Sequence, residues 1–115
     1  MPVDGGYAKH TEWPIVERDH AGSVAYLDAR IGEVLGALVE LELESKTVVF
    51  FASDNGAHNE GGHDVHFFDS TGGLRGFKRS YYEGGIRSPS IIRWPGVTAA
   101  GGYTQVASTQ AATHR

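Results

Sequence analysis

The sequence predicts an α/β fold in which a central, mostly parallel sheet is flanked by helices. Two patterns indicate this fold. Apolar residues recur with helical spacing over residues 23–43, and residues 47–52 form a continuous apolar run. This run is rich in β-branched and aromatic residues, as is typical of a strand buried on both faces. With 115 residues, the chain has a common size for one domain.

The predicted helix covers about residues 23–43. Its apolar positions are Leu27, Ile31, Val34, Leu35, Leu38 and Leu41. Charged residues fill other positions, as a helix with one buried face requires. Ser23 is the expected N-cap, because its hydroxyl can accept a hydrogen bond from the first turn. Residues 1–22 are expected to be irregular, since the residue before Pro14 is disfavoured in a helix.

Two strands are predicted, at about residues 47–52 and 90–94, and Pro95-Gly96 ends the second. Residues 53–88 between them are rich in glycine and show little periodicity. Connections of this length in a compact domain usually carry a function or are disordered. We therefore expect the functional residues to lie between residues 53 and 88.

Composition excludes several classes of protein. The net charge is −4, which argues against a general nucleic-acid-binding surface. No stretch approaches the roughly 18 apolar residues of a membrane-spanning segment. Residues 1–20 are polar and charged throughout and do not resemble a signal peptide. The chain has no cysteine, so it can form neither disulfides nor a thiolate metal site, and it has no Cys nucleophile.

Asp54 and Asn55 follow the first predicted strand directly. In open α/β sheets, ligands bind beyond the carboxyl ends of the strands. A carboxylate and an amide carbonyl are hard oxygen donors that suit Ca²⁺ or Mg²⁺. Gly56 would let the chain turn sharply, so that these side chains converge on one ion. An Asx turn that ends the strand explains the same three residues, and spacing does not separate the two interpretations.

The histidines that follow allow another kind of metal site. His58, His63 and His66 with Asp64 could bind zinc, because imidazole and carboxylate groups are both zinc ligands. Their spacing matches none of the helical zinc signatures. A structural role, or a hydrogen bond to a substrate, is the favoured interpretation of these side chains.

A cluster of cations lies in the second half of the connection. Its members are Arg75, Lys78, Arg79 and Arg87. Lys78 follows Gly76, which would permit close approach of a ligand, and a lysine can serve as a point charge for an anion. The pattern is not a P-loop, because no Ser or Thr follows Lys78. The alternative is a solvated basic loop that pairs with Glu83.

The stretch SDNGAHNEGGHDVHFFDSTGGLRGFKRSYYEGGIRSPSIIRWPG strongly resembles the sulfatase family, a member of the alkaline-phosphatase-like superfamily. The motifs DNG, LRG-x-K, YEGG-x-R-x-P and RWPG occur in the family's order and spacing. The resemblance covers roughly residues 7–97. It implies that residues 1–115 are the C-terminal part of a sulfatase catalytic domain, and therefore part of an alkaline-phosphatase-like sandwich.

The resemblance also implies roles for individual residues. Asp54 and Asn55 match two ligands of the family's active-site Ca²⁺, and Lys78 matches the lysine that contacts the sulfate group. Residues 82–87 match a scaffold motif that supports the loop. The implied substrate is a sulfated small molecule or carbohydrate, and the implied partner is the remainder of the sulfatase domain.

The family's nucleophile is not encoded here. Sulfatases use formylglycine, made from Cys or Ser in a Cys/Ser-x-Pro-x-Arg motif, and the chain contains no such motif. The chain is therefore expected to be inactive alone. Two other functions stay open: a fragment of a phosphodiesterase or phosphonate hydrolase with zinc or manganese, and a non-catalytic module that binds calcium or an anion.

Overall fold

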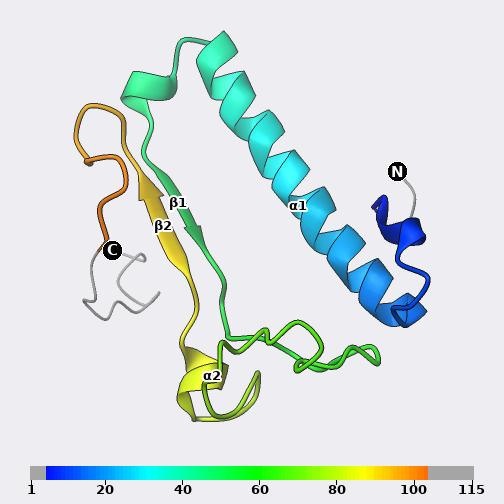
Figure 1. Cartoon of the computed structure of the whole chain (residues 1–115). Helices are drawn as coiled ribbons and strands as arrows, with labels where there is room; N and C mark the ends of the chain where they lie inside the picture. The colour runs from blue at the N-terminus through cyan, green and yellow to red at the C-terminus, as the bar shows by residue number, and fades with distance from the viewer. Residues whose placement is uncertain (1–4, 104–115) are drawn as a thin grey trace.

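The computed structural model describes residues 5–103. In chain order the elements are η1 (Tyr7–Lys9), α1 (Ile15–Glu40), η2 (Glu44–Lys46), β1 (Val49–Ala52), α2 (Glu83–Ile86) and β2 (Ser90–Arg93). Figure 1 shows α1 and the two strands as separate arms that meet at η2. At the other end of these arms, the connection after β1 runs toward the N-terminal half of α1.

Helix α1 begins at Ile15, so the prediction that it starts near Ser23 is wrong. Pro14 lies at the N-cap, and its carbonyl accepts hydrogen bonds from Glu17 N (3.0 Å) and Arg18 N (3.2 Å). A proline suits this place because the N–H groups of the first turn have no partner within the helix. Ser23 lies inside the helix, where its hydroxyl donates to the Asp19 carbonyl at 2.8 Å.

The helix ends at Glu40, slightly before the predicted end at residue 43. Glu42 has a φ of 56°, and this left-handed conformation turns the chain toward η2. Although α1 is long, neither it nor any other helix within residues 5–103 has a stretch apolar enough to cross a membrane.

Strands β1 and β2 pair in the antiparallel direction, with Phe50 opposite Ile92 and Phe51 opposite Ile91. The prediction of a mostly parallel sheet is therefore wrong for these two strands. Parallel neighbours need a crossover element, and residues 53–88 contain only the four-residue helix α2. The ion pair between Glu44 and Arg93 ties the end of β2 to η2.

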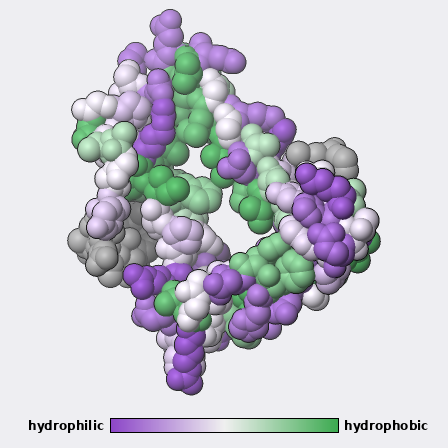
Figure 2. Space-filling model, viewed as in Figure 1, coloured by the Kyte–Doolittle hydropathy of each residue, from purple (hydrophilic) through white to green (hydrophobic). Residues whose placement is uncertain are grey.

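Few apolar side chains are enclosed. Within residues 5–103, Val65 is the only apolar residue that is buried, with 2% of its surface exposed. Figure 2 shows an opening between α1 and the strands, with apolar residues on both sides of it. Residues on these arms that are more than half exposed include Val24, Leu27, Val34, Val39, Phe50, Ile91 and Ile92. The prediction that the first strand is buried on both faces is thus wrong for this chain by itself, since Phe50 is 64% exposed.

The exposure of so many apolar side chains leads to a prediction about stability. The 115-residue chain alone should unfold without a sharp cooperative transition, because two strands without further cover rarely form a stable sheet. The measurement is a thermal melt followed by circular dichroism, with sedimentation to establish the oligomeric state. A steep two-state melt from a monomer would show that the chain is stable by itself.

Candidate functional site

Asp54 and Asn55 lie directly after β1, as the sequence predicts. Asp54 is exposed, and within residues 5–103 its carboxylate has no hydrogen-bond or ion-pair partner. Asn55 is half-buried, and its Nδ2 donates to the Gly56 carbonyl at 2.9 Å. Because Nδ2 makes this bond, Oδ1 is the atom of Asn55 that is left to bind a ligand. Two hard oxygen donors are thus present after β1, and such donors are the type that Ca²⁺ prefers.

Two backbone segments cross closely near Asp54 and Asn55. The crossing brings the segment that carries Arg75 and Lys78 to these two residues. A Cβ atom on Gly56 would overlap the Gly84 carbonyl oxygen, and one on Gly84 would overlap the Gly76 carbonyl oxygen. Only glycine allows the chain segments to approach so closely. The crossing is fastened by hydrogen bonds from Gly56 N to Gly85 O (2.9 Å) and from Gly84 N to Arg75 O (2.8 Å).

Lys78 belongs to the same crossing. Its backbone N–H donates to the Ala57 carbonyl at 2.7 Å, two residues after Asn55. Its Nζ donates to Glu60 Oε2 at 3.2 Å, and both side chains are about one-third exposed. The structure therefore joins the three predicted site residues through one backbone arrangement.

Glu60 also binds the next cation along the chain. Arg79 Nη2 lies 2.6 Å from Glu60 Oε1, so the side chains of Lys78 and Arg79 reach the same carboxylate. The hydrogen bond from Lys78 holds the pKa of Glu60 below its usual value, against the opposing effect of burial. Neighbouring side chains can reach one carboxylate here because Arg79 has a left-handed φ of 76°.

A buried acid–base pair fixes the connection to α1. Glu17 is 2% exposed and His63 is 4% exposed, and Glu17 Oε2 lies 2.5 Å from His63 Nδ1. The second oxygen of Glu17 accepts the Asp64 N–H at 2.8 Å. Both oxygens of this carboxylate are therefore satisfied, as a buried acidic group requires.

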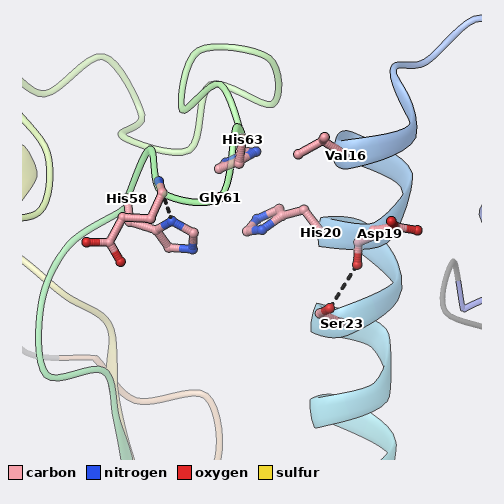
Figure 3. Close-up of a pocket in the computed structure, with 8 residues that line it drawn as sticks. Val16, Asp19, His20, Ser23, His58, Gly61 and His63 are labelled. Carbon is pink, nitrogen blue, oxygen red and sulfur yellow. Dashed lines mark hydrogen bonds between the residues drawn. The ribbon is translucent and has the colours of Figure 1, made fainter.

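Three imidazoles and parts of α1 surround a small pocket beside this pair (Figure 3). We call it the imidazole pocket. It has a volume of about 240 Å³ and is lined by Val16, Asp19, His20, Ser23, His58, Glu60, Gly61 and His63. His20 stacks on His63 with 3.8 Å between ring centroids, and His58 lies edge-on to His63. Burial, followed by the neighbouring His63 and His58, lowers the pKa of His20.

The zinc interpretation of the histidines is not supported by this arrangement. Within residues 5–103 no group of three or more His, Asp or Glu side chains has a geometry that could hold a metal. The rings of His20 and His63 are stacked at an interplanar angle of 11°, so their in-plane lone pairs run side by side and do not converge. His66 is exposed and does not line the pocket.

Sequence reasoning missed Glu17 and His20. Both lie in a segment that was expected to be irregular. Once α1 is known to begin after Pro14, their spacing of three residues places them on one helix face. The Trp13-Pro14 step, interpreted as a helix start, was the available signal.

The pair of Glu17 and His63 leads to a prediction about pH. Burial acts to raise the pKa of Glu17, but the Asp64 N–H and the His63 ring outweigh it and leave this pKa below 4.5. A lowered pKa in the folded state stabilises the protein above about pH 4.5, and this contribution is lost as pH falls through the lowered value. In a full-length protein that carries this segment, Glu17→Gln should lower the Tm by about 2–8 °C at neutral pH.

The measurement is the Tm of both proteins as a function of pH. The difference between them should narrow below pH 4.5, because the parental carboxyl is then increasingly protonated. Glu40→Gln is the control, since Glu40 is exposed at the other end of α1. An equal loss of stability for Glu17→Gln at all pH values would show that the carboxylate charge is not what stabilises the loop.

Comparisons with known proteins agree with the motifs. Residues 12–114 match the profile of the sulfatase family. The chain is 40% identical over 84 residues to steryl-sulfatase from Rattus norvegicus, covering 71% of this chain and 15% of that protein. It is 38% identical over 78 residues to N-acetylgalactosamine-6-O-sulfatase from Bacteroides thetaiotaomicron, covering 63% of this chain and 15% of that protein.

The chain spans only about 15% of the length of these relatives. The family match nevertheless covers most of the chain, including the loop that joins Asp54 and Asn55 to Lys78. The chain belongs to the sulfatase family.

Proposed function

We propose that this chain is the part of a sulfuric ester hydrolase that supplies two calcium ligands and the sulfate-binding lysine. Asp54 and Asn55 are the ligands, and Lys78 is the residue that contacts sulfate. The observation that supports this proposal is the hydrogen bond from Lys78 N to Ala57 O, because it holds the backbone of the lysine against the chain two residues after Asn55. Membership of the sulfatase family supports the choice of reaction.

The roles follow from the chemistry of the groups. Bound Ca²⁺ would supply positive charge that polarises the sulfuryl oxygens. Lys78 brings an ammonium group that neutralises a sulfate oxygen or assists the departing alcohol oxygen. Glu60 orients this ammonium, because its carboxylate accepts a hydrogen bond from Nζ at 3.2 Å.

The remainder of a sulfatase domain is the proposed partner of the chain. The apolar residues on α1 and on the strands would be covered by this partner, which would also provide further sheet neighbours. The proposal is consistent with the difference in length between this chain and its relatives. It also explains why an ordinary content of hydrophobic residues, 40%, leaves so small a core.

The test of the proposal is hydrolysis by a full-length sulfatase that carries this segment. It should release sulfate from 4-nitrophenyl sulfate and contain calcium. Stoichiometric zinc that is lost in His63→Ala, together with hydrolysis of a phosphate diester, would favour the phosphodiesterase alternative. Calcium binding without turnover of either substrate would favour a non-catalytic module.

The 115-residue chain alone provides a further prediction. It should hydrolyse 4-nitrophenyl sulfate no faster than buffer, because the covalent nucleophile is not encoded in it. Its affinity for Ca²⁺ should be weak, since two donors are few against the roughly 6–8 oxygens that Ca²⁺ takes. The measurements are a colorimetric assay and calcium titration calorimetry. Turnover that persists through purification would contradict the prediction.

A further inference from the structure

One carboxylate holds two cations beside the proposed sulfate site. Glu60 Oε2 accepts a hydrogen bond from Lys78 Nζ at 3.2 Å, and Glu60 Oε1 lies 2.6 Å from Arg79 Nη2. Oε1 is shielded from solvent, and its contact with Arg79 is an ion pair rather than a hydrogen bond of regular geometry. Arg79 therefore acts on this carboxylate mainly through its charge.

The backbone at Arg79 takes a conformation that arginine rarely adopts. Ser80 N donates to Phe77 O at 2.9 Å, and this bond closes a four-residue turn whose third residue is Arg79. Arg79 has a φ of 76°. A positive φ at this place is the pattern of a type II turn, which normally has Gly or Asn there. Because such strained residues cluster at functional sites, an arginine here indicates a role for its side chain.

The charges of the three groups decide what an anion would meet. Lys78 and Glu60 alone would have no net charge, and the carboxylate would repel a sulfate group that approaches the ammonium. Arg79 adds a second cation, so two cations and one carboxylate leave a net positive charge. The Lys78 ammonium has three donors, and it can bind a sulfate oxygen while one N–H stays on Glu60.

We propose that Arg79 is a positioning residue of the sulfate site and acts through Glu60. It offsets the charge of this carboxylate, so that Lys78 attracts sulfate while Glu60 still orients its ammonium. This inference rests on the proposed function, because it takes Lys78 as the residue that contacts sulfate. The Arg79 side chain is 80% exposed, so its effect should be modest and sensitive to salt.

The experiment uses inorganic sulfate as a competitive inhibitor of 4-nitrophenyl sulfate hydrolysis by a full-length sulfatase that carries this segment. Arg79→Asn removes the charge and introduces a residue that tolerates a positive φ. It should raise the Ki of sulfate and the KM by roughly 2–5-fold at low salt, the size expected for one exposed charge, with kcat little changed. The difference should shrink at high salt, because screening weakens the attraction between exposed charges.

Two further variants separate the charge of Arg79 from the geometry of the turn. Arg79→Lys keeps the charge and should keep most of the sulfate affinity. Arg79→Asn combined with Glu60→Gln restores the net positive charge and should recover the Ki, since the glutamine carbonyl is neutral and can still accept the Lys78 hydrogen bond. Arg30→Asn is the matched control: Arg30 pairs with Glu33 at 2.6 Å on α1, and its loss should leave the Ki unchanged.

An unchanged Ki in Arg79→Asn, or a loss that the double variant does not recover, would overturn the inference. Lys78→Ala distinguishes this failure from failure of the proposed function. If Lys78→Ala weakens sulfate binding and Arg79→Asn does not, only the role of Arg79 is wrong. If Lys78→Ala leaves both Ki and kcat unchanged, the proposed sulfate site is wrong, and the role of Arg79 is wrong with it.

Discussion

Lys78→Ala in a full-length sulfatase that carries this segment should lower kcat by roughly 10²–10³-fold, as does loss of one donor that stabilises an oxyanion. The reason is that charge on the sulfuryl oxygens and the leaving oxygen changes as the S–O bond breaks. The Lys78 ammonium then interacts more strongly in the transition state than in the bound substrate. Steady-state kinetics with 4-nitrophenyl sulfate measures the effect.

Two further variants sharpen this experiment. Lys78→Arg should recover only part of the activity, since a planar guanidinium does not reproduce a compact ammonium. Arg79→Ala is unsuitable as a control, because Arg79 shares the Glu60 carboxylate with Lys78. Lys46→Ala is suitable, because Lys46 is exposed in η2. Near-parental kcat and KM in Lys78→Ala, with calcium content unchanged, would refute the assignment of Lys78.

Asp54→Ala should lower calcium occupancy and activity together. Loss of groups that only support metal ligands typically costs about 10–100-fold, and a direct ligand should cost at least the upper value, about 100-fold. Excess Ca²⁺ should restore part of the activity by mass action, which a purely structural defect would not allow. Metal analysis of the purified protein and kinetics at several calcium concentrations give the two readouts.

The matched control for this variant is Asp28→Ala, which removes an exposed carboxylate from α1. It should leave calcium content unchanged. If Asp54→Ala keeps full calcium occupancy, the Asx-turn interpretation of Asp54, Asn55 and Gly56 becomes the better one.

The local pattern of apolar residues predicted that α1, β1 and β2 exist. It did not predict where α1 begins or in which direction the two strands pair. The start of α1 was misplaced because Ser23 is a good cap residue, whereas the first turns after Pro14 carry Glu17, a charged residue that is buried. Burial of a carboxylate depends on partners such as His63, 46 positions away in the chain, and helical periodicity does not report them. The antiparallel direction of β1 and β2 likewise depends on the path that residues 53–88 take between the two strands, and local pattern does not report this path.

The candidate site residues were predictable one by one, but their arrangement was not. Oxygen donors after a strand indicated Asp54 and Asn55, but no spacing rule linked them to Lys78, and only the family resemblance did. The physical link is the mutual fit of Gly56 and Gly84, which meet only once the chain has folded. A pattern of glycines shows where close approaches are permitted and does not show which glycines approach each other.

The position of the Glu17–His63 pair has a consequence for the order of folding. Helix α1, η2 and β1 follow one another closely, and α1 can form from local hydrogen bonds. The Glu17–His63 contact joins groups that are 46 residues apart, and it must overcome the entropy of closing that long loop. We therefore expect this contact to form late, after α1. The geometry around His58 and Lys78 would then be completed only at the end of folding.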